Sequence, residues 1–593
     1  MSLISAEEFA KIIHVDKYGS FGQFVAEHLM DMLQISAVNR IYEKYAQDKE
    51  LGFLNNIIDE LGIQLDIPED DFKRLPKSGP FIVIANHPFG ALDGIILLQL
   101  LCNRYPNFKI LGNFLLHRIE PLRPYIAGVN PFEDMKGIQS SVPGVREALN
   151  HLKSGHPLGI FPAGEVSTFR NKKEKIVDKD WQTSAIKFIM KARVPVVSVY
   201  FHGKNSILFY MLSRLNGKLR TAKLPSEFVN KKNRVIQIRI GGPVSTDKIK
   251  SFDDPLLLKE FLRKKTYILS KGIKEKPKKS ILKRLLPMPK IHPIAELGNQ
   301  EMIIREMDIL RIKGDLLFQV NKYEVFLASA KQIPFALHEL GRLREISFRM
   351  IGEGTLKERD IDTFDATYKH LILWDSEEEI ITGAYRMGLG QDLFNQSGVK
   401  GFYLNTLFRF HPEFHPILRQ SVEMGRAFVI KEYQQKPLPL FLLWKGILHT
   451  LMRYPDYNYL LGGVSISNSY SDFSKAVMIE FIKANYFDHN LARWVKPRNA
   501  CKIRIDENLK SFIMEITESD LKIFDRMIGE LESDGRKMPI LLKKYFMQNA
   551  KIIGFNTDPR FNNAIDGLAY IRIADIPPET TQIAMNKKEG EMV

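Results

Sequence analysis

The chain has 593 residues, 45% hydrophobic and 26% charged, a balance that predicts two to four globular domains and excludes collagen-like, disulfide-scaffold and wholly disordered chains. Two cysteines, Cys102 and Cys501, are too few for a disulfide framework or a cysteine metal cage, so a reducing cytoplasm fits best. The net charge of +16 attracts polyanions, which are nucleic acid, anionic lipid headgroups or an acidic carrier protein.

No segment has the pattern of a signal peptide or of a membrane-spanning helix. Acidic residues interrupt the first twenty positions, where a signal peptide needs an apolar core. The most apolar runs, residues 94–102 and 438–444, are shorter than the ~20 residues that a spanning helix needs. We therefore expect a cytoplasmic protein that lies on the membrane surface if it meets one.

The first half of the chain predicts helices followed by an alternating pattern of strands and helices. Residues 1–75 form a predicted helical region, with apolar residues three and four positions apart through residues 21–46. Strand-like runs then occur at 81–85, 158–161, 194–200 and 235–240, with helical patterns between them at 145–153 and 181–191. This order predicts an α/β layered domain over residues 76–270.

The composition changes at residues 271–295, which we interpret as a basic linker. Lysine and proline dominate it, with a few large apolar residues. Two interpretations stay open: a solvated hinge, or a segment whose apolar residues enter a membrane interface while its lysines meet anionic headgroups. A second α/β domain is predicted over residues 296–580.

The first candidate site is ANHPFGALDG, directly after the strand at 81–85. At the end of a buried strand, Asp93 can hold the His87 ring and favour the cation that forms when the ring takes up a proton. Pro88 and Gly90 make the intervening turn feasible. The alternative is a structural hydrogen bond between His87 and Asp93.

Two further motifs follow in order, FPAGEVS at 161–167 and VPVVSVY at 194–200. Together the three resemble the glycerolipid acyltransferase family, whose motifs are NHxxxxD, an FPEGTRS-like block and a VPVVPV-like strand, and the resemblance covers roughly residues 75–245. Five residues rather than four separate His87 from Asp93, and Glu165 follows Gly164 instead of preceding it. The form NHPxGxxDG is similar to the branch of the family that acylates aminolipids.

This resemblance implies roles for the residues that match its motifs. His87 is the general base that takes the proton of an acceptor hydroxyl, which attacks an acyl thioester, and Asp93 orients His87. The residues implied in substrate binding are Asn86, Gly90, Phe161, Pro162, Gly164 and Glu165. Strand-end packing is the alternative for Phe161 and Pro162. The basic residues Arg170, Lys172 and Lys173 either meet a phosphate or carboxylate or form a solvated loop.

In the second half, an acidic D-x-D-x-x-D run at residues 360–365 leads into further motifs. We expect no metal there, because His338 and His370 do not complete a ligand set and the run lacks the glycine and late glutamate of an EF-hand. The next motifs are His370-Leu371, Gly383-x-Tyr385-Arg386 and Glu423-Met-Gly-Arg426. Their order resembles N-acyltransferases with a GNAT-like fold, including autoinducer synthases.

This second resemblance implies a mixed sheet in which the strand at 459–467 separates from its neighbour to admit the thioester arm. Backbone N–H groups exposed there can bind the pantetheine chain and stabilise the oxyanion. The block at 538–571 looks like that of the ornithine- and glycine-lipid N-acyltransferases. An amine must lose a proton and attack the thioester, so Glu423 is the candidate base and Arg386 or Arg426 the carboxylate ligand. The alternative is that Glu423 and Arg426 pair on one helix face.

The whole chain resembles the bifunctional acyltransferases that make ornithine-type or related aminolipids. The fold class that this implies is α/β with two domains, a layered acyltransferase domain behind N-terminal helices and a GNAT-like domain with a mixed sheet. The C-terminal domain N-acylates an amino acid such as ornithine or glycine with a 3-hydroxyacyl chain, and the N-terminal domain O-acylates the hydroxyl that results. The co-substrate is acyl-ACP or acyl-CoA, with no bound cofactor.

The expected partners are acyl carrier protein and an anionic membrane surface, with the enzyme peripheral on the inner face of the cytoplasmic membrane. Nucleic acid is disfavoured, because zinc-finger spacing, an RNP-like aromatic block and a basic heptad region are absent from the sequence. Two alternatives stay open. One is a lysophospholipid O-acyltransferase whose C-terminal domain recruits carrier protein, and the other is a non-catalytic membrane-associated scaffold.

Overall fold

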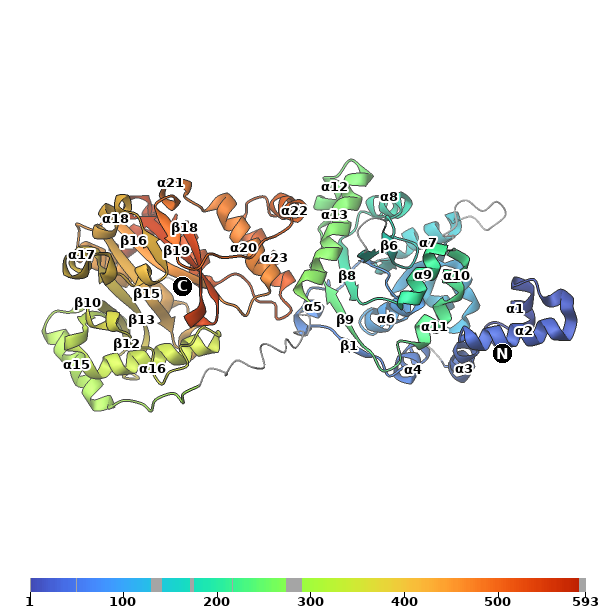
Figure 1. The fold of residues 1–593 in the computed structure, drawn as a ribbon, viewed down its shortest axis with the longest axis horizontal. Helices are drawn as coiled ribbons and strands as arrows, with labels where there is room; N and C mark the ends of the chain where they lie inside the picture. Colours follow the sequence, from blue (N-terminus) through green and yellow to red (C-terminus); the bar gives the residue numbers. More distant parts are fainter. Residues whose placement is uncertain are drawn as a thin grey trace. The chain divides into compact units, whose positions relative to one another are not determined.

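A computed structural model of the chain describes residues 2–48, 51–129, 141–170, 175–215, 217–273 and 291–585. The chain divides into two compact units, Met1–Lys274 with Gly529–Arg536, and Glu275–Ile528 with Lys537–Val593. Each unit has its own sheet and is described by itself (Figure 1). Lys172, Lys173 and most of the predicted linker, residues 274–290, lie outside the described residues.

The first unit is built on a sheet with the strand order β1-β9-β8-β2-β5-β3-β4. Neighbouring strands are parallel except β8 and β9, which are antiparallel. The central strand β2 (Ile82–Ala85) is fully buried between β5 and β8, as its run of apolar residues predicts. The other strands are β1 (Gln64–Asp66), β3 (Lys109–Asn113), β4 (Ile126–Val129), β5 (Leu158–Ile160), β8 (Val196–His202), β9 (Val235–Ile240) and the separate pair β6 (Thr168–Arg170) and β7 (Lys175–Val177).

Helices cover both faces of this sheet. One face carries Val197 and packs against α4 and α6. The neighbouring residue Ser198 points to the other face, where its hydroxyl accepts a hydrogen bond from Thr266 of α13 at 3.1 Å. This layering confirms the α/β fold predicted for the first half. The helices are α3 (Ile35–Tyr45), α4 (Gly52–Glu60), α5 (Glu69–Lys73), α6 (Ala91–Cys102), α7 (Val142–Lys153), α8 (Thr183–Ala192), α9 (Ile207–Leu215), α10 (Gly217–Ala222), α11 (Leu224–Val229), α12 (Thr246–Lys250) and α13 (Pro255–Ile268).

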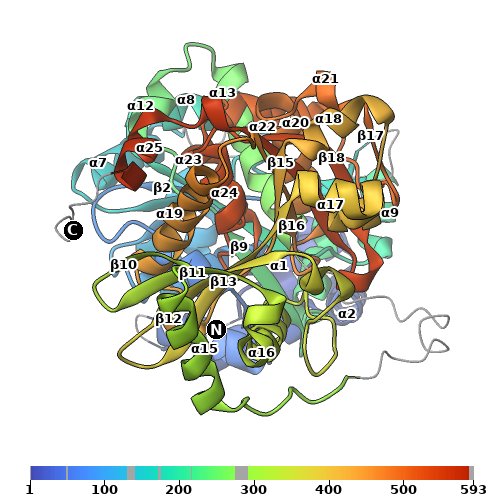
Figure 2. The ribbon, with the colours of Figure 1, turned by 90° about the vertical axis from the view of Figure 1, so that its left-hand side faces the viewer.

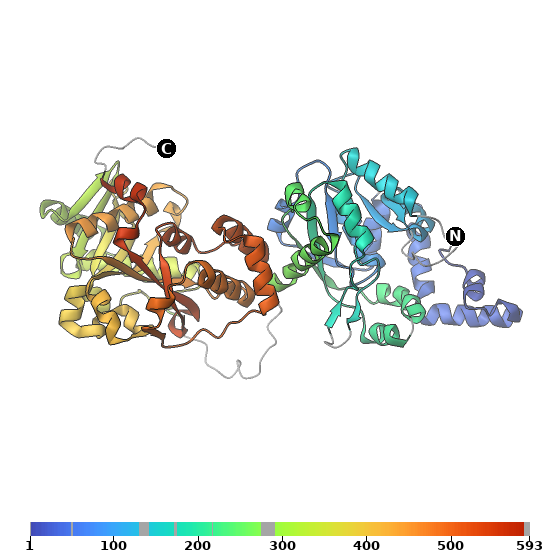
Figure 3. The same ribbon diagram turned by 90° about the horizontal axis from the view of Figure 1, so that it is seen from above.

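The chain begins with helices that stand beside the sheet of the first unit. α1 (Ala6–Ile12) and α2 (Gly19–Met32) pack on each other around a small apolar cluster of their own. Figure 3 shows these dark-blue helices at the edge of the unit. Phe21 and Phe24 on α2 are 67% and 65% exposed, so this helix presents aromatic side chains that the unit itself does not cover.

The second unit is built on a sheet with the order β10-β11-β12-β13-β15-β16-β19-β18. All neighbours are antiparallel except β15 and β16, which are parallel, so the sheet is mixed, as predicted. The strands are β10 (Leu316–Val320), β11 (Tyr323–Ser329), β12 (Lys369–Asp375), β13 (Ile380–Leu389), β15 (Ser421–Val429), β16 (Tyr459–Ile466), β18 (Lys551–Asp558), β19 (Ala564–Arg572) and the separate pair β14 (Phe408–Phe410) and β17 (Val495–Pro497).

The two parallel strands separate part of the way along their length. β15 and β16 are paired from Ser421 with Tyr459 to Met424 with Gly462. Beyond that point β15 continues to Val429 and β16 to Ile466 without pairing to each other, while each keeps its partner on the other side. Among the residues that the structure describes, 425–429 of β15 therefore have no neighbouring strand on the side of β16.

Helices cover both faces of the second sheet as well. Ile372 packs in one cluster with α15 and α16, whereas the next residue, Leu371, lies against Gly446 of α19. Figure 2 accordingly has α15 and α16 on one side of β11–β13 and α19 on the other. The helices are α15 (Gln300–Ile312), α16 (Pro334–Met350), α17 (Gly390–Ser397), α18 (His415–Arg419), α19 (Leu438–Arg453), α20 (Asp472–Asn485), α21 (His489–Ala492), α22 (Glu507–Thr517), α23 (Leu521–Leu531), α24 (Ile540–Phe546) and α25 (Pro578–Met585).

The two most apolar runs of the sequence fall in helices that pack on the sheets. Residues 94–102 belong to α6 and residues 438–444 to α19. Within the described part of the chain, no helix is both long enough and apolar enough to cross a bilayer.

Candidate active sites

The first candidate site follows β2, where the chain turns into α6. Gly90 adopts a positive φ of 90°, which favours glycine, and caps the start of the helix. Nδ1 of His87 lies 2.9 Å from Oδ2 of Asp93, and the same oxygen accepts the backbone N–H groups of Phe89 and Gly90 at 2.9 and 3.0 Å. The turn thus accommodates the five intervening residues and brings the two predicted residues together.

The pair leaves one ring atom of the histidine available. The Asp93 side chain is wholly buried, whereas 18% of the His87 side chain is exposed. Burial raises the pKa of Asp93, and hydrogen bonds from the His87 ring and the backbone oppose that rise. When Nδ1–H donates to Asp93, Nε2 carries the free lone pair, and it has no partner among the described residues. The arrangement can accept a proton at Nε2 and stabilise the cation formed there.

Asn86, the residue before the histidine, joins two strands. Its side-chain amide donates to the carbonyl of Phe201 at 2.9 Å and accepts the N–H of the same residue at 2.7 Å. Both polar ends of the amide are therefore used, and Asn86 is buried. A substrate contact at Asn86 stays a prediction that this pairing does not favour.

The predicted acceptor block follows β5 and lies beside the histidine. The ring centroid of Phe161 is 4.4 Å from that of His87. Pro162 is buried, and its carbonyl accepts the N–H of Gln182 at 2.8 Å. At Gly164 φ is 66°, a backbone conformation that favours glycine, and the Gln182 side-chain amide lies next to this position. Phe161 flanks the candidate base, while Pro162 and Gly164 fix the loop that carries it.

Glu165 connects this loop to a neighbouring helix. Its carboxylate accepts hydrogen bonds from Lys179 at 2.8 Å and from Arg220 of α10 at 2.7 Å. Burial raises the pKa of Glu165, but these two hydrogen bonds outweigh that effect, and the pKa is lowered overall. Glu165 is thus charged and engaged at neutral pH. Arg170, the other predicted residue described here, lies on β6.

Sequence reasoning missed Asp178, which holds the two halves of this site together. One carboxylate oxygen accepts the backbone N–H of His87 at 3.1 Å and the hydroxyl of Ser167 at 2.6 Å. The backbone N–H of Ser167 donates to the His87 carbonyl at 2.8 Å. Ser167 belonged to the predicted block, but nothing near Asp178 in the sequence indicates its partner 91 residues away.

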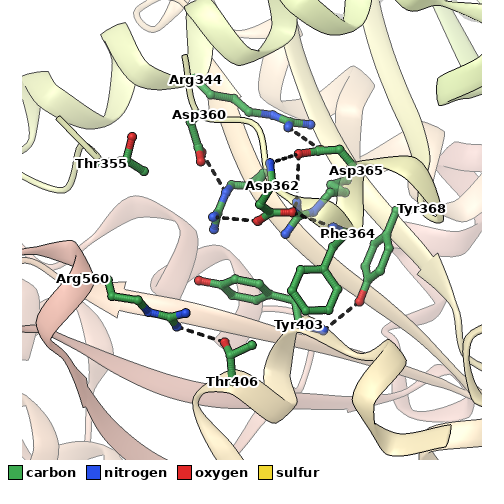
Figure 4. A network of polar contacts seen from close by, with 12 residues as sticks. Arg344, Thr355, Asp360, Asp362, Phe364, Asp365, Tyr368, Tyr403, Thr406 and Arg560 are labelled. Carbon is green, nitrogen blue, oxygen red and sulfur yellow. Dashed lines mark hydrogen bonds and ion pairs between the residues drawn. The ribbon is translucent and has the colours of Figure 1, made fainter. Parts of the chain in front are cut away.

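In the second candidate site, the carboxylates of Asp360, Asp362 and Asp365 lie among arginine side chains (Figure 4). Arg344 donates to Asp365 at 2.7 Å. Arg386 contacts Asp362 at 2.6 Å and Asp365 at 3.3 Å, and Arg426 contacts Asp360 at 2.8 Å and Asp362 at 3.3 Å. The acids of the D-x-D-x-x-D run are each matched by an arginine, and the rings of Phe364 and Tyr403 lie alongside.

These ion pairs bear on the predicted role of two arginines. The side chains of Arg386 and Arg426 are 1% and 10% exposed, and both are bound to the chain's own carboxylates. Carboxylate binding by either arginine stays a prediction, because a substrate would have to compete with Asp360 and Asp362. His370 is fully buried in the same region, and burial with Arg344 beside it lowers its pKa to about 4, which keeps the ring neutral.

Glu423 lies on β15, so the alternative of a Glu423–Arg426 pair on a helix face is wrong. Its two oxygens accept the Tyr368 hydroxyl at 2.7 Å and the Leu404 N–H at 2.9 Å, and the residue is 2% exposed. Burial raises its pKa to about 7. That value suits a base, but both oxygens are occupied, so the role of Glu423 as the base stays a prediction that its closed environment does not favour.

A bulge in β15 marks the point where the parallel strands separate. Between the register pairs Ala384–Phe428 and Arg386–Gly425, two residues of β15 oppose one of β13. Arg426 occupies the bulge with φ of 53°, an uncommon conformation for a residue with a side chain. The bulge turns Arg426 toward Asp360 and away from the regular alternation of the strand.

A further group of polar residues lies beyond this point and was also missed by the sequence analysis. Ser465 of β16 donates its hydroxyl to Glu353 at 2.6 Å, and Glu353 is 8% exposed. Asp566 of β19 is the register partner of Ser465. The block at 538–571 includes Asp566, but Glu353 comes from a loop more than 200 residues earlier, and no local spacing connects them.

Comparison with known protein families agrees with the two folds. Residues 22–275 match the family model described as acyltransferase, and residues 343–444 match that of the acetyltransferase (GNAT) domain. These regions contain His87 and Asp93 on one side and Arg386, Glu423 and Arg426 on the other. The chain is therefore an acyltransferase in both of its halves.

Three relatives show which kinds of acyltransferase this chain is similar to. A glycine N(alpha)-acyltransferase of Bacteroides thetaiotaomicron is 31% identical over 277 residues, which are 43% of this chain and 81% of the relative. A lyso-glycine lipid O-acyltransferase of Phocaeicola vulgatus is 26% identical, over 45% of this chain and 95% of the relative. An L-ornithine N(alpha)-acyltransferase of Rhizobium meliloti is 33% identical, over 22% of this chain and 47% of the relative. The chain belongs to the glycine N(alpha)-acyltransferase family, here joined to a second acyltransferase domain as in the fused aminolipid synthases that the sequence resembles.

Proposed function

We propose that this chain makes a doubly acylated aminolipid in two steps. The second half N-acylates an amino acid, glycine or ornithine, with a 3-hydroxyacyl chain, and the first half O-acylates the 3-hydroxyl. The observation that carries the proposal is that one chain is similar to relatives named for both reactions. The order follows from chemistry, because the hydroxyl acceptor exists only after the hydroxyacyl chain is attached.

In the O-acylation step, His87 is the general base. Nε2 takes the proton of the acceptor hydroxyl, whose oxygen attacks the thioester carbonyl carbon. The C–O bond forms, the C–S bond breaks, and the proton on Nε2 passes to the departing thiolate. Asp93 holds Nδ1 at 2.9 Å, which fixes the ring orientation and favours the imidazolium between the two proton transfers. Phe161 covers one face of the ring.

In the N-acylation step, the thioester arm enters where β15 and β16 separate. The N–H groups of β15 beyond Met424 have no partner strand on that side among the described residues, so they are available to the pantetheine chain and to the oxyanion. The neutral amine of the acceptor attacks the carbonyl carbon, and the thiol leaves. The open space around Gly425 supports this assignment, since no atom lies within 4 Å of the position that a Cβ would take.

The donor in both steps is an acyl-ACP or acyl-CoA thioester, and the enzyme works peripherally on the inner face of the cytoplasmic membrane. The net charge of +16 supports both partners, because acyl carrier proteins are acidic and anionic headgroups attract Lys and Arg. Phe21 and Phe24 on α2 supply apolar side chains that suit the headgroup region of a bilayer. Carrying both domains on one chain raises the effective concentration of the intermediate at the second site.

The test is mass spectrometry of total lipids from a bacterial host that lacks aminolipids, with and without this gene. The proposal requires a new lipid with one amide-linked 3-hydroxyacyl chain and one ester-linked chain, and the fragment ions identify the head group. A shift in phospholipid acyl composition without that lipid would favour the lysophospholipid O-acyltransferase instead. If neither change appears in a host supplied with the amino acid and the 3-hydroxyacyl donor, the two-step proposal is wrong.

A further inference from the structure

Asp566 lies on β19 at a level where β15 and β16 have already separated. Its register partner on β16 is Ser465, three residues beyond Gly462, the last residue of β16 that pairs with β15. Side chains alternate along a strand, so Asp566 shares a face with Leu568, which packs in one cluster with Leu461, the register partner of Glu423. Asp566 therefore points to the same face of the sheet as Glu423, at the open end of the strand pair.

Charged groups from several elements surround this position. Glu353 comes from the loop after α16 and is bound to Ser465 at 2.6 Å. The end of β18 and the turn after it supply Asp558 and Arg560, which form an ion pair of 3.2 Å. Arg426 from the bulge of β15 completes the ring of charges that act on Asp566.

In the described part of the chain, the Asp566 carboxylate is not bound to any of these groups. Among the described residues its carboxylate forms no hydrogen bond and no ion pair, and its side chain is partly exposed. Burial and the neighbouring carboxylates of Asp558 and Glu353 raise its pKa well above the usual range, and Arg426 and Arg560 lower it by less. A carboxyl group that lies among several charges and is bound to none of them can take up a proton from a group that binds beside it.

We propose that Asp566 is the base of the N-acylation step and that, with Glu353, it binds the ammonium group of the amino acid. The inference rests on the proposed function, because it names the group that prepares the amine for attack. Asp566 takes one proton from R–NH₃⁺, and the freed lone pair attacks the thioester carbonyl carbon. The C–N bond forms and the C–S bond breaks, the second N–H proton leaves with the thiolate as a thiol, and Asp566 passes its proton to water.

Glu423 offers a direct contrast on the same face of the sheet. Its carboxyl is enclosed by Tyr368 and the Leu404 backbone, whereas the carboxyl of Asp566 is open and unpaired. Asp566 and Glu353 also place two carboxyl groups beside Ser465, and a cationic acceptor that binds there favours the charged form of both. The acceptor class that fits this pair of carboxyl groups is a primary ammonium.

The experiment uses the full-length protein, a 3-hydroxyacyl-CoA donor and glycine or ornithine, and measures both thiol release and amide product. Asp566→Asn keeps the shape of the side chain and removes the base, so kcat for amide formation should fall about 10²- to 10⁴-fold. Asp566→Glu should restore part of the rate. O-acylation of a supplied N-(3-hydroxyacyl) amino acid should be unchanged in both variants, because that site lies in the other unit, and the partial activity of Asp566→Glu reports that the second unit is folded.

Substituting the charged neighbours of Asp566 tests whether this residue acts as a base or has only a structural role. The acid limb of kcat/KM against pH should follow the proton on Asp566, because activity is lost when it is protonated. Glu353→Gln removes a negative charge and should move that limb to lower pH, whereas Arg560→Gln removes a positive charge and should move it to higher pH. The matched control is Arg572→Gln on the same strand, six residues away and paired with Asp575, which should leave the limb where it is.

Two failures are distinguishable. If the wild-type protein forms no amide with any amino acid although it O-acylates the hydroxylated acceptor, the proposed N-acylation falls and this inference with it. If the wild type forms the amide and Asp566→Asn forms it at the same rate with the same pH profile, only the assignment of Asp566 is wrong. Shifts of equal sign for Glu353→Gln and Arg560→Gln would likewise contradict it.

Discussion

The two candidate sites both contain buried carboxylates, but they leave different atoms free. In the first unit, Asp93 binds Nδ1 of His87, and Nε2 of the ring is left for chemistry. In the second unit, the arginines of the sequence motifs are paired with the acids beside them, and Asp566 has no partner within the described ranges. The comparison teaches that a motif locates a group of polar residues, whereas the contacts around each side chain decide which of its atoms stay open.

The largest expected effect tests the first site. His87→Gln removes the base and should reduce O-acylation about 10⁴-fold, so that the singly acylated amino acid accumulates. Lipid mass spectrometry of cells that express the variant measures both products. N-acylation should continue at the wild-type rate, because His87 belongs to the other unit.

The matched control is His156→Gln, a half-buried histidine of the same unit whose ring lies beside His151. It should leave both products at wild-type levels. Normal formation of the doubly acylated lipid by His87→Gln would show that His87 is not the base.

A smaller loss is expected from Asp93→Asn. The side chain can still accept one hydrogen bond from the ring, but it no longer carries the charge that favours imidazolium, so kcat for O-acylation should fall about 10³-fold. Single-turnover measurements with a supplied N-(3-hydroxyacyl) amino acid separate this loss from binding. A KM effect with unchanged kcat would mean that Asp93 shapes the site without acting on the ring.

The first site was predictable because its chemistry is local. His87 and Asp93 are six residues apart, and the glycine and proline between them indicate the turn that joins them. Asp178 was not predictable, since its contact with the His87 backbone spans 91 residues and depends on how β6 and β7 return the chain. Asn86, conversely, was assigned to substrate binding from its motif. In the structure both ends of the Asn86 amide are bound to the backbone of Phe201 on the neighbouring strand.

The second site shows more clearly that spacing in the sequence does not predict which side chains pair. The mixed sheet and the separation of its parallel strands were predicted from a resemblance in motif order, and the strands bear this out. The partners of Arg386 and Arg426 were not predicted, although the acids lie in a run that the sequence analysis singled out. Spacing gives the residue types in a region, whereas their pairing depends on β12, β13 and β15 meeting in register.

The raised pKa of Glu423 predicts how the free energy of unfolding changes with pH. Because burial raises its pKa to about 7, the folded chain keeps a proton that the unfolded chain loses near its ordinary pKa. The folded state therefore binds more protons between these values, and the free energy of unfolding falls as pH rises through this window, by about 3 kcal/mol in all. Above pH 7 the free energy of unfolding is lowered by this whole amount, and below the ordinary carboxyl pKa it is not lowered at all.

The variant Glu423→Gln has no such proton to lose. The difference in unfolding free energy between wild type and variant should change with pH over the same window and be flat outside it, as measured by denaturant unfolding at several pH values. A difference that does not vary with pH would mean that the carboxyl is ionised at all these values in the folded chain, which would make it a better candidate for the base than its enclosure indicates.

The smallest effect concerns the surface of the first unit and not its site. Phe21 and Phe24 present most of their area to solvent on α2, and burying part of each ring in a bilayer contributes about 1 kcal/mol, less than full burial would. Replacing both with Ser removes about 2 kcal/mol and should weaken binding to anionic phospholipid vesicles about 30-fold, as measured by flotation. The control is the exposed pair Ile309 and Ile312 on α15, where the same change should have no effect. If both double variants float alike, the membrane is met through charge alone, and the aromatic face of α2 plays no part in bringing His87 to its lipid acceptor.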